Sequence, residues 1–204
     1  RIQVGQTVEI KSPIETQKLI AIHEVGHTIV GYFQEDYDKV EKVTIVPRTN
    51  GAGGLTFFTP SENLLNSGLY SKNYLLSKLR VIMGGRAAER LMYGDFGITT
   101  GAGNDIEQAT RIAKDIVNTF GFDDDTGPIT INAERNPTSS ETLYNSEVKI
   151  ATLIKNAEKE AIDLLDSKKS LVNIITDELL DKKTLSGSDI SKLVELHDVW
   201  YYLS

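Results

Sequence analysis

Two histidines and a glutamate lie within five consecutive positions, His23-Glu24-Val25-Gly26-His27, a spacing suited to metal-assisted hydrolysis. Residues four apart in a helix share a face, with Cβ atoms about 6 Å apart, so both imidazoles can reach one Zn²⁺ ion. Glu24 points about 100° away, where it can hold a water bound to the metal. Zinc lowers the pKa of such a water to about 7, and a carboxylate can take its proton. The pattern predicts two zinc ligands and a general base for amide hydrolysis.

Catalytic zinc usually has three protein ligands, so a third must lie elsewhere in the chain. The metzincin pattern fails, because Val30 and Phe33 occupy the positions that would need Gly and His. His197 is one candidate, although a lone histidine in an amphipathic helix is more often structural. Asp105, between a glycine-rich loop and a helix start, is the best-placed carboxylate, but it could equally be a helix cap. The motif itself has an alternative, in which both histidines are satisfied in a helix interface and Glu24 is exposed.

The composition of the 204 residues is that of an ordinary globular protein, with 40% apolar and 25% charged residues. A net charge of −7 without a Lys/Arg cluster argues against nucleic acid as a partner. The lack of cysteine excludes disulfides, thiolate zinc sites and iron–sulfur clusters. No window approaches 18 apolar residues, so we expect this chain itself to be soluble. The chain begins at Arg1, and we expect it to be a fragment or a processed product.

Hydrophobic periodicity predicts that the motif lies on a buried helix spanning about 13–33, with Ser12 as cap and Glu15 completing a capping box. Two short β-branched segments, 40–46 and 55–58, predict a hairpin or a small sheet around a turn at 49–54. Residues 61–71, 94–103 and 121–140 are expected to be connections, with a further turn at 185–188. The predicted later helices span 74–93, 105–120, 141–167, 169–182 and 188–200. Gly84-Gly85, inside the first of these, indicates close backbone packing.

Five motifs in order resemble the peptidase domain of the FtsH family, which are membrane-anchored AAA+ zinc proteases. The motifs are His23–His27, Val43-Thr-Ile-Val-Pro-Arg48, Gly53-Gly-Leu-Thr56, Gly84-Gly-Arg-Ala-Ala-Glu89 and Thr100-Gly-Ala-Gly-Asn-Asp105-Ile-Glu-Gln-Ala-Thr110. The resemblance covers about residues 12–195. It implies a mainly α fold across 1–204, with a catalytic part at 12–122 that carries the small β element and a C-terminal helical bundle at 140–204.

The resemblance also implies roles for particular residues. His23, His27 and Asp105 match the family's three zinc ligands, and Glu24 matches its catalytic glutamate. Glu89 matches a glutamate expected to orient a ligand histidine; its alternative is a surface ion pair with Arg86 or Arg90. The strand residues Gly53, Gly54, Leu55, Thr56 and Phe57 match a strand beside the family's active site, whose open edge could hold an extended substrate; the alternative is an ordinary hairpin edge. Val25 replaces a frequent alanine, a change that should not affect ligation.

The resemblance further implies a metalloendopeptidase acting on unfolded or membrane proteins, as a homohexamer coupled to an AAA+ ATPase at a bacterial or organelle membrane. No Gly-x-x-x-x-Gly-Lys-Ser/Thr sequence occurs here, so an ATPase module would lie elsewhere in a longer chain or in a partner. Two other functions remain open: a catalytically silent, peptidase-like scaffold that helps to build a ring, and a zinc hydrolase of small molecules.

Overall fold

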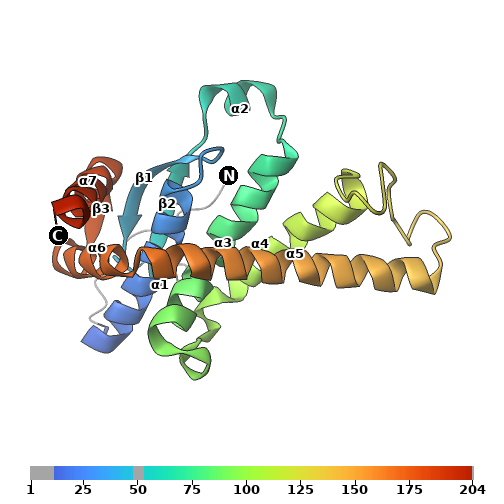
Figure 1. The fold of residues 1–204 in the computed structure, drawn as a ribbon. Helices are drawn as coiled ribbons and strands as arrows, with labels where there is room; N and C mark the ends of the chain where they lie inside the picture. The colour runs from blue at the N-terminus through green and yellow to red at the C-terminus, as the bar shows by residue number, and fades with distance from the viewer. Residues whose placement is uncertain (1–11, 48–52, 204) are drawn as a thin grey trace.

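The computed structural model describes residues 12–47 and 53–203, and helices make up most of this part of the chain (Figure 1). The expected mainly α fold with a small β element is confirmed. Helix α1 crosses α3, and the long α5 packs along α3. Within these ranges no helix has the length and apolar character needed to span a membrane. The helices are α1 (Ile14–Tyr32), α2 (Glu62–Ser67), α3 (Lys72–Tyr93), α4 (Gly103–Lys114), α5 (Ser140–Ser167), α6 (Lys169–Lys182) and α7 (Gly187–Leu203).

A three-stranded antiparallel sheet lies beside α1, with β1 (Lys39–Thr44) between β2 (Leu55–Thr59) and β3 (Thr184–Ser186). In β1, Val43 pairs with Thr56 on one side and with Leu185 on the other. The two predicted strands are therefore present. Strand β3 is a correction, because residues 184–186 pair with β1 where the sequence predicted a simple turn. Residues 49–52 of the predicted turn lie outside the described residues.

The connection predicted at 61–71 contains helix α2, and this part of the prediction was wrong. The Ser61 hydroxyl caps the helix by accepting from the backbone N–H of Leu64. Gly68 ends it with φ of 63°, a left-handed conformation that glycine adopts without steric cost. Both signals are visible in the sequence, but six residues are too few for helical periodicity to show.

The start of α1 also differs from the prediction. Pro13 occupies the N-cap position and no side chain caps the helix, so the predicted capping box of Ser12 and Glu15 does not form. Instead, the Ser12 carbonyl accepts a hydrogen bond of 2.7 Å from Gln17 Nε2. The loop expected at 94–103 contains two short 3₁₀ turns, and the helix predicted to reach 120 changes to a π turn after Lys114.

Helices α1 and α3 cross with their backbones in close contact at two glycines. A Cβ atom on Gly26 would lie 2.2 Å from the carbonyl oxygen of Gly84, and one on Gly84 would lie 2.8 Å from the carbonyl oxygen of Gly26. Both distances are shorter than van der Waals contact, so only glycine permits this approach. The close packing predicted from Gly84-Gly85 is therefore present, and it brings the motif helix directly against α3.

Apolar residues from the early and late segments of the chain share one core. Ile22 and Ile29 of α1 belong to the same buried cluster as Leu165 of α5 and Leu171 and Ile175 of α6. Burial of this kind stabilises a fold by about 25 cal/mol per Å² of apolar surface. The predicted segments 12–122 and 140–204 thus pack against each other, and their division into a catalytic and a C-terminal part stays a prediction.

Candidate metal centre

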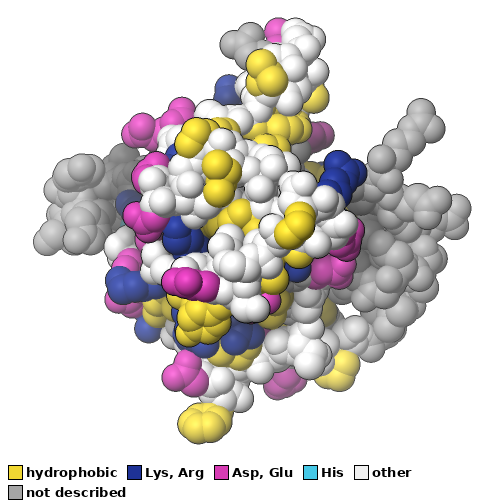
Figure 2. All heavy atoms as spheres, turned by 90° about the vertical axis from the view of Figure 1, so that its right-hand side faces the viewer, with side chains coloured by type: hydrophobic (Ala, Val, Ile, Leu, Met, Phe, Trp, Pro, Cys, Tyr) yellow, Lys and Arg dark blue, Asp and Glu magenta, His cyan; other side chains and the backbone are white. Residues whose placement is uncertain are grey.

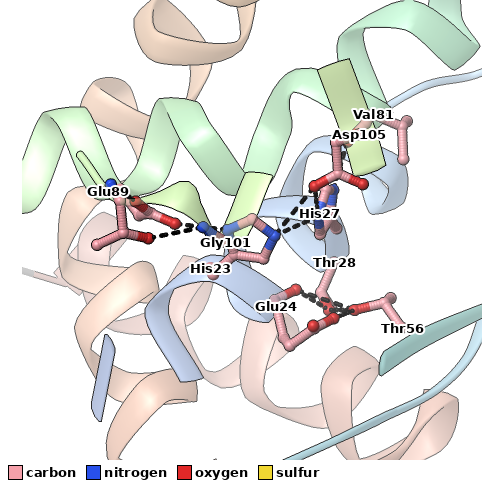
Figure 3. A network of polar contacts seen from close by, with 10 residues as sticks. His23, Glu24, His27, Thr28, Thr56, Val81, Glu89, Gly101 and Asp105 are labelled. Atoms are coloured by element: carbon pink, nitrogen blue, oxygen red, sulfur yellow. Dashed lines mark hydrogen bonds and ion pairs between the residues drawn. The ribbon is translucent and has the colours of Figure 1, made fainter. Parts of the chain in front are cut away.

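Two histidines of α1 and an aspartate far from them in sequence direct one donor atom each toward a common point (Figure 3). His23 Nε2 lies 3.0 Å from His27 Nε2 and 3.1 Å from Asp105 Oδ2, and His27 Nε2 lies 3.4 Å from Asp105 Oδ2. Ligands on a tetrahedral Zn²⁺ with bonds of about 2.0–2.1 Å are separated by roughly 3.4 Å. The spacing of these three atoms therefore fits the ligand set of one metal ion.

The other ring nitrogen of each histidine fixes its tautomer. His27 Nδ1 lies 2.7 Å from the carbonyl oxygen of Val81, which can only accept, so Nδ1 carries a proton. His23 Nδ1 lies 2.7 Å from Glu89 Oε1, and the pKa of Glu89 is lowered: burial raises it, but the bonds from His23 and from the Thr99 backbone outweigh that effect. Glu89 is therefore ionised and accepts a hydrogen bond from the Nδ1–H of His23. An imidazole whose only ring proton is on Nδ1 has its Nε2 lone pair free for a metal, and in both histidines Nε2 faces the common point.

Three acceptor atoms at these distances need a positive charge between them. Burial alone would lower the pKa of His23, but the hydrogen bonds to Asp105 and Glu89 raise it to about 10. Burial alone would raise the pKa of Asp105, but the two histidines hold it well below its usual range. Without a metal the cluster keeps a proton, and metal binding has to displace that proton. The donor set of two imidazoles and a carboxylate is one that Zn²⁺ accepts.

Asp105 reaches the two histidines from the first turn of α4, 82 residues from His23. The N-cap position of α4 is Ala102, which has no capping side chain, so Asp105 does not cap this helix. Only 17% of the Asp105 side chain and 12% of each imidazole are exposed. The other candidate, His197, lies on α7 with its Nε2 2.5 Å from Ser170 Oγ, outside the cluster.

Glu89 is fully buried on α3 and connects two parts of the cluster. One oxygen accepts from His23 Nδ1, and the other accepts from the backbone N–H of Thr99 at 2.7 Å. Thr99 belongs to the loop that leads to Asp105, so Glu89 contacts both a candidate ligand and the segment that delivers another. The alternative ion pairs are absent from this arrangement, since Arg86 and Arg90 both contact Glu158 of α5.

We expect Glu89→Gln to weaken zinc binding about 10- to 100-fold, because the substitution keeps the volume but removes the charge that orients His23. Competition titration with a chromophoric zinc chelator measures this change. Glu107→Gln, an exposed carboxylate on α4, is the matched control and should leave the affinity unchanged. Equal zinc affinity in Glu89→Gln and the unaltered protein would contradict this role.

Glu24 lies beside the cluster without being part of it, and 8% of the residue is exposed. Its Oε2 accepts a hydrogen bond of 2.8 Å from Thr56 Oγ1 of β2 (Figure 3). Gly54 leaves room for this carboxylate, since a Cβ there would lie 2.7 Å from Glu24 Cγ and 2.9 Å from Oε1. Residues 53–57 thus run past the buried carboxylate, although the two glycines precede β2 and only Leu55–Phe57 belong to it. Strand β2 lies at an edge of the described sheet. The alternative of an exposed Glu24 does not fit this burial.

The cluster lies inside the molecule, where α1, α3 and α4 meet. Figure 2 shows the side that faces right in Figure 1, where acidic and basic side chains are interspersed and no described histidine is visible.

Comparison with known proteins adds independent information about this chain. The sequence profile of peptidase family M41 matches residues 11–193. The chain belongs to peptidase family M41. This M41 chain is 35% identical to "ATP-dependent zinc metalloprotease FtsH 3" of Synechocystis sp., over 95% of its own length and 33% of that protein.

Two plant relatives are also similar to the M41 chain. The identity is 37% to "ATP-dependent zinc metalloprotease FTSH 5, chloroplastic" of Arabidopsis thaliana, over 88% of the chain and 27% of that protein. It rises to 48% with "ATP-dependent zinc metalloprotease FTSH, chloroplastic" of Capsicum annuum, over 57% of the chain and 18% of that protein. The M41 chain therefore spans a third or less of the length of these relatives. The resemblance to the FtsH family is confirmed.

Sequence reasoning missed three contacts around the cluster: the Val81 carbonyl, the Thr99 amide and the glycine at position 85. The first two are backbone groups, which carry no side-chain signal at all. Gly85 did carry a signal, because a Gly-Gly pair inside a helix is costly unless something approaches the backbone. Here the approaching groups are the imidazoles themselves, since a Cβ on Gly85 would lie 2.5 Å from His23 Nε2 and 2.6 Å from His27 Nε2.

Proposed function

We propose that this M41 chain is the peptidase domain of a zinc metalloendopeptidase, in which His23, His27 and Asp105 hold Zn²⁺. The observation that carries the proposal is the convergence of their three acceptor atoms within 3.0–3.4 Å of one another. Relatives named as zinc metalloproteases support the choice of metal. In this arrangement Glu89 orients His23 and fixes its tautomer.

Glu24 is proposed as the general base of peptide hydrolysis. When bound, Zn²⁺ supplies Lewis-acid chemistry, polarising the scissile carbonyl and making water more acidic. The Glu24 carboxylate takes a proton from the attacking water as its oxygen bonds to the carbonyl carbon. The same carboxylate then gives that proton to the leaving nitrogen as the carbon–nitrogen bond breaks. Its burial beside the cluster supports this role.

Residues 53–57, which include the first part of the β2 edge, are proposed to hold the substrate. Residues 53–57 run past Glu24, and β2 has a neighbour only on its β1 side in the described sheet. An extended peptide can add to such an edge through backbone hydrogen bonds, which recognise the chain rather than its side chains. Substrates would therefore be unfolded proteins, or unfolded segments of membrane proteins, with little sequence preference.

The intact protein is proposed to couple this peptidase to an AAA+ ATPase, in cis or in a partner, within a membrane-associated homohexamer. The support is that the relatives are named as ATP-dependent and are at least three times as long as the region matched. Translocation by such a module would deliver unfolded chains to the edge of β2.

The proposal is tested by metal content and proteolysis together. We expect about one zinc per chain in the unaltered protein and cleavage of casein into peptides that a chelator stops. Asp105→Ala should lower zinc affinity by roughly 100-fold or more, because one of three protein ligands is lost. Glu107→Ala, at an exposed position on α4, is the control.

Other outcomes favour the two alternative functions. A folded protein that binds no zinc and leaves casein intact would be a silent scaffold module, and the proposal would fail. Zinc binding with hydrolysis of small amides but not of casein would indicate a small-molecule hydrolase. Full zinc affinity in a correctly folded Asp105→Ala protein would remove Asp105 from the ligand set.

A further inference from the structure

The Thr56 side chain of β2 reaches the motif helix α1. Its hydroxyl lies 2.8 Å from Glu24 Oε2, 3.1 Å from the Glu24 carbonyl oxygen and 3.5 Å from Thr28 Oγ1. A hydroxyl has a single proton, so it can donate to only one of these acceptors.

The neighbouring bonds decide where that proton goes. The Glu24 carbonyl already accepts the Thr28 hydroxyl at 2.8 Å, in addition to the backbone N–H four residues later in α1. A carbonyl oxygen has two lone pairs, and both are used. The charged carboxylate is also the stronger acceptor, so Thr56 donates to Glu24 Oε2.

We propose that Thr56 is a positioning residue, whose hydroxyl holds the Glu24 carboxylate in the orientation needed for proton transfer. The inference rests on the proposed function, because it gives Thr56 a task only if Glu24 is the general base. Gly54 lies on the other side of the carboxylate. A Cβ atom at this position would be only 2.9 Å from Glu24 Oε1, so a glycine leaves the carboxylate room. The carboxylate thus lies between Thr56 of β2, which donates to it, and Gly54 just before β2, which leaves it space.

This arrangement links the substrate edge to the base through one short strand. The backbone of Thr56 pairs with Val43 of β1, so the position of its hydroxyl is set by the sheet. A displacement of β2 relative to α1 would carry the hydroxyl away from Glu24. Misplacing a catalytic group by about 1 Å can lower a rate about 100-fold.

Thr56→Val tests the proposal, because valine keeps the shape and the strand preference but has no hydroxyl. In the full-length protein, with a fluorogenic peptide as substrate, we expect kcat to fall about tenfold with KM unchanged. Thr56→Ser, which restores the hydroxyl, should recover most of the lost kcat. Zinc affinity should be unchanged in both variants, because Thr56 contacts none of the three candidate ligands.

Thr59→Val is the matched control. Thr59 lies on the same strand and donates to another carboxylate, Glu41 Oε2 at 2.5 Å, on an exposed part of the sheet. The Thr59→Val substitution should leave kcat, KM and zinc affinity unchanged. If Thr59→Val lowers kcat as much as Thr56→Val, the effect is one of strand stability, and the proposal fails.

The remaining outcomes separate this inference from the proposed function. Unchanged kcat in Thr56→Val, in a protein that Glu24→Gln inactivates, overturns the positioning role alone. A raised KM with unchanged kcat also overturns it, since that would make the side chain a substrate contact. If Glu24→Gln leaves cleavage intact, the proposed function fails and this inference fails with it.

Discussion

Glu24→Gln should lower kcat/KM for peptide cleavage about 1,000-fold, within the range of 10²–10⁴ typical of a lost general base. Glutamine has nearly the same shape and can still accept the Thr56 hydroxyl, but its amide cannot take a proton from water. Because Glu24 is outside the ligand cluster, zinc affinity should stay within about twofold of the unaltered protein. The loss of rate would then reflect chemistry rather than an empty or unfolded site.

Steady-state cleavage of casein or of a fluorogenic peptide measures this loss, with metal analysis on the same preparation. Glu15→Gln is the control, since Glu15 is an exposed carboxylate in the first turn of the same helix. Proteolysis that persists unchanged in pure Glu24→Gln protein would exclude Glu24 as the base. Loss of zinc together with activity would show instead that Glu24 takes part in metal binding.

The parts of the site that depend on local spacing could be predicted from the sequence. His23 and His27 are brought together by one turn of helix, and the apolar residues around them identify that helix. The structure places their Nε2 atoms 3.0 Å apart. The geometry of α1 is enough to bring the two side chains to one face, and for that reason five residues of sequence were enough to predict the pair.

The parts that depend on distant packing could not be derived from local sequence. Asp105 follows a glycine-rich loop at a helix start, a context that suits a cap as well as a ligand. What distinguishes the two is the position of His23, 82 residues earlier. Glu89 poses the same problem, because its arginine neighbours are three residues before it and one after it. The structure shows that both arginines pair with Glu158 of α5, and that Arg90 also pairs with Asp95.

The fold shows the same division between local and distant causes. Helices α5 and α6 were predicted within a residue of their ends, because their apolar periodicity is long and uninterrupted. Strand β3 was missed, because three residues have no periodicity and their partner, β1, lies about 140 residues earlier. The Gly84-Gly85 pair could be interpreted only in part from the sequence. It predicted that another group packs closely against the helix backbone, but it could not identify that group as α1 and its two imidazoles.

Gly85→Ala should disrupt the zinc site without altering any ligand. A Cβ on Gly85 would lie 2.5 Å from His23 Cε1 and Nε2 and 2.6 Å from His27 Nε2, so both imidazoles would have to move. Alanine favours a helix by about 1 kcal/mol over glycine, so α3 itself should not be weakened. We therefore expect zinc affinity to fall at least about tenfold and kcat/KM about 100-fold in a protein that still folds.

Gly103→Ala is the matched control for this prediction. Gly103 has helical dihedral angles, φ −58° and ψ −45°, and a Cβ there would meet no atom within 4 Å. Alanine at such a position stabilises a protein by about 0.4–1 kcal/mol and should leave zinc binding unchanged. Zinc titration and circular dichroism of both variants separate the two cases. Full zinc affinity in Gly85→Ala would mean that the imidazoles have room to move away from α3, and the helix backbone would then not determine where they lie.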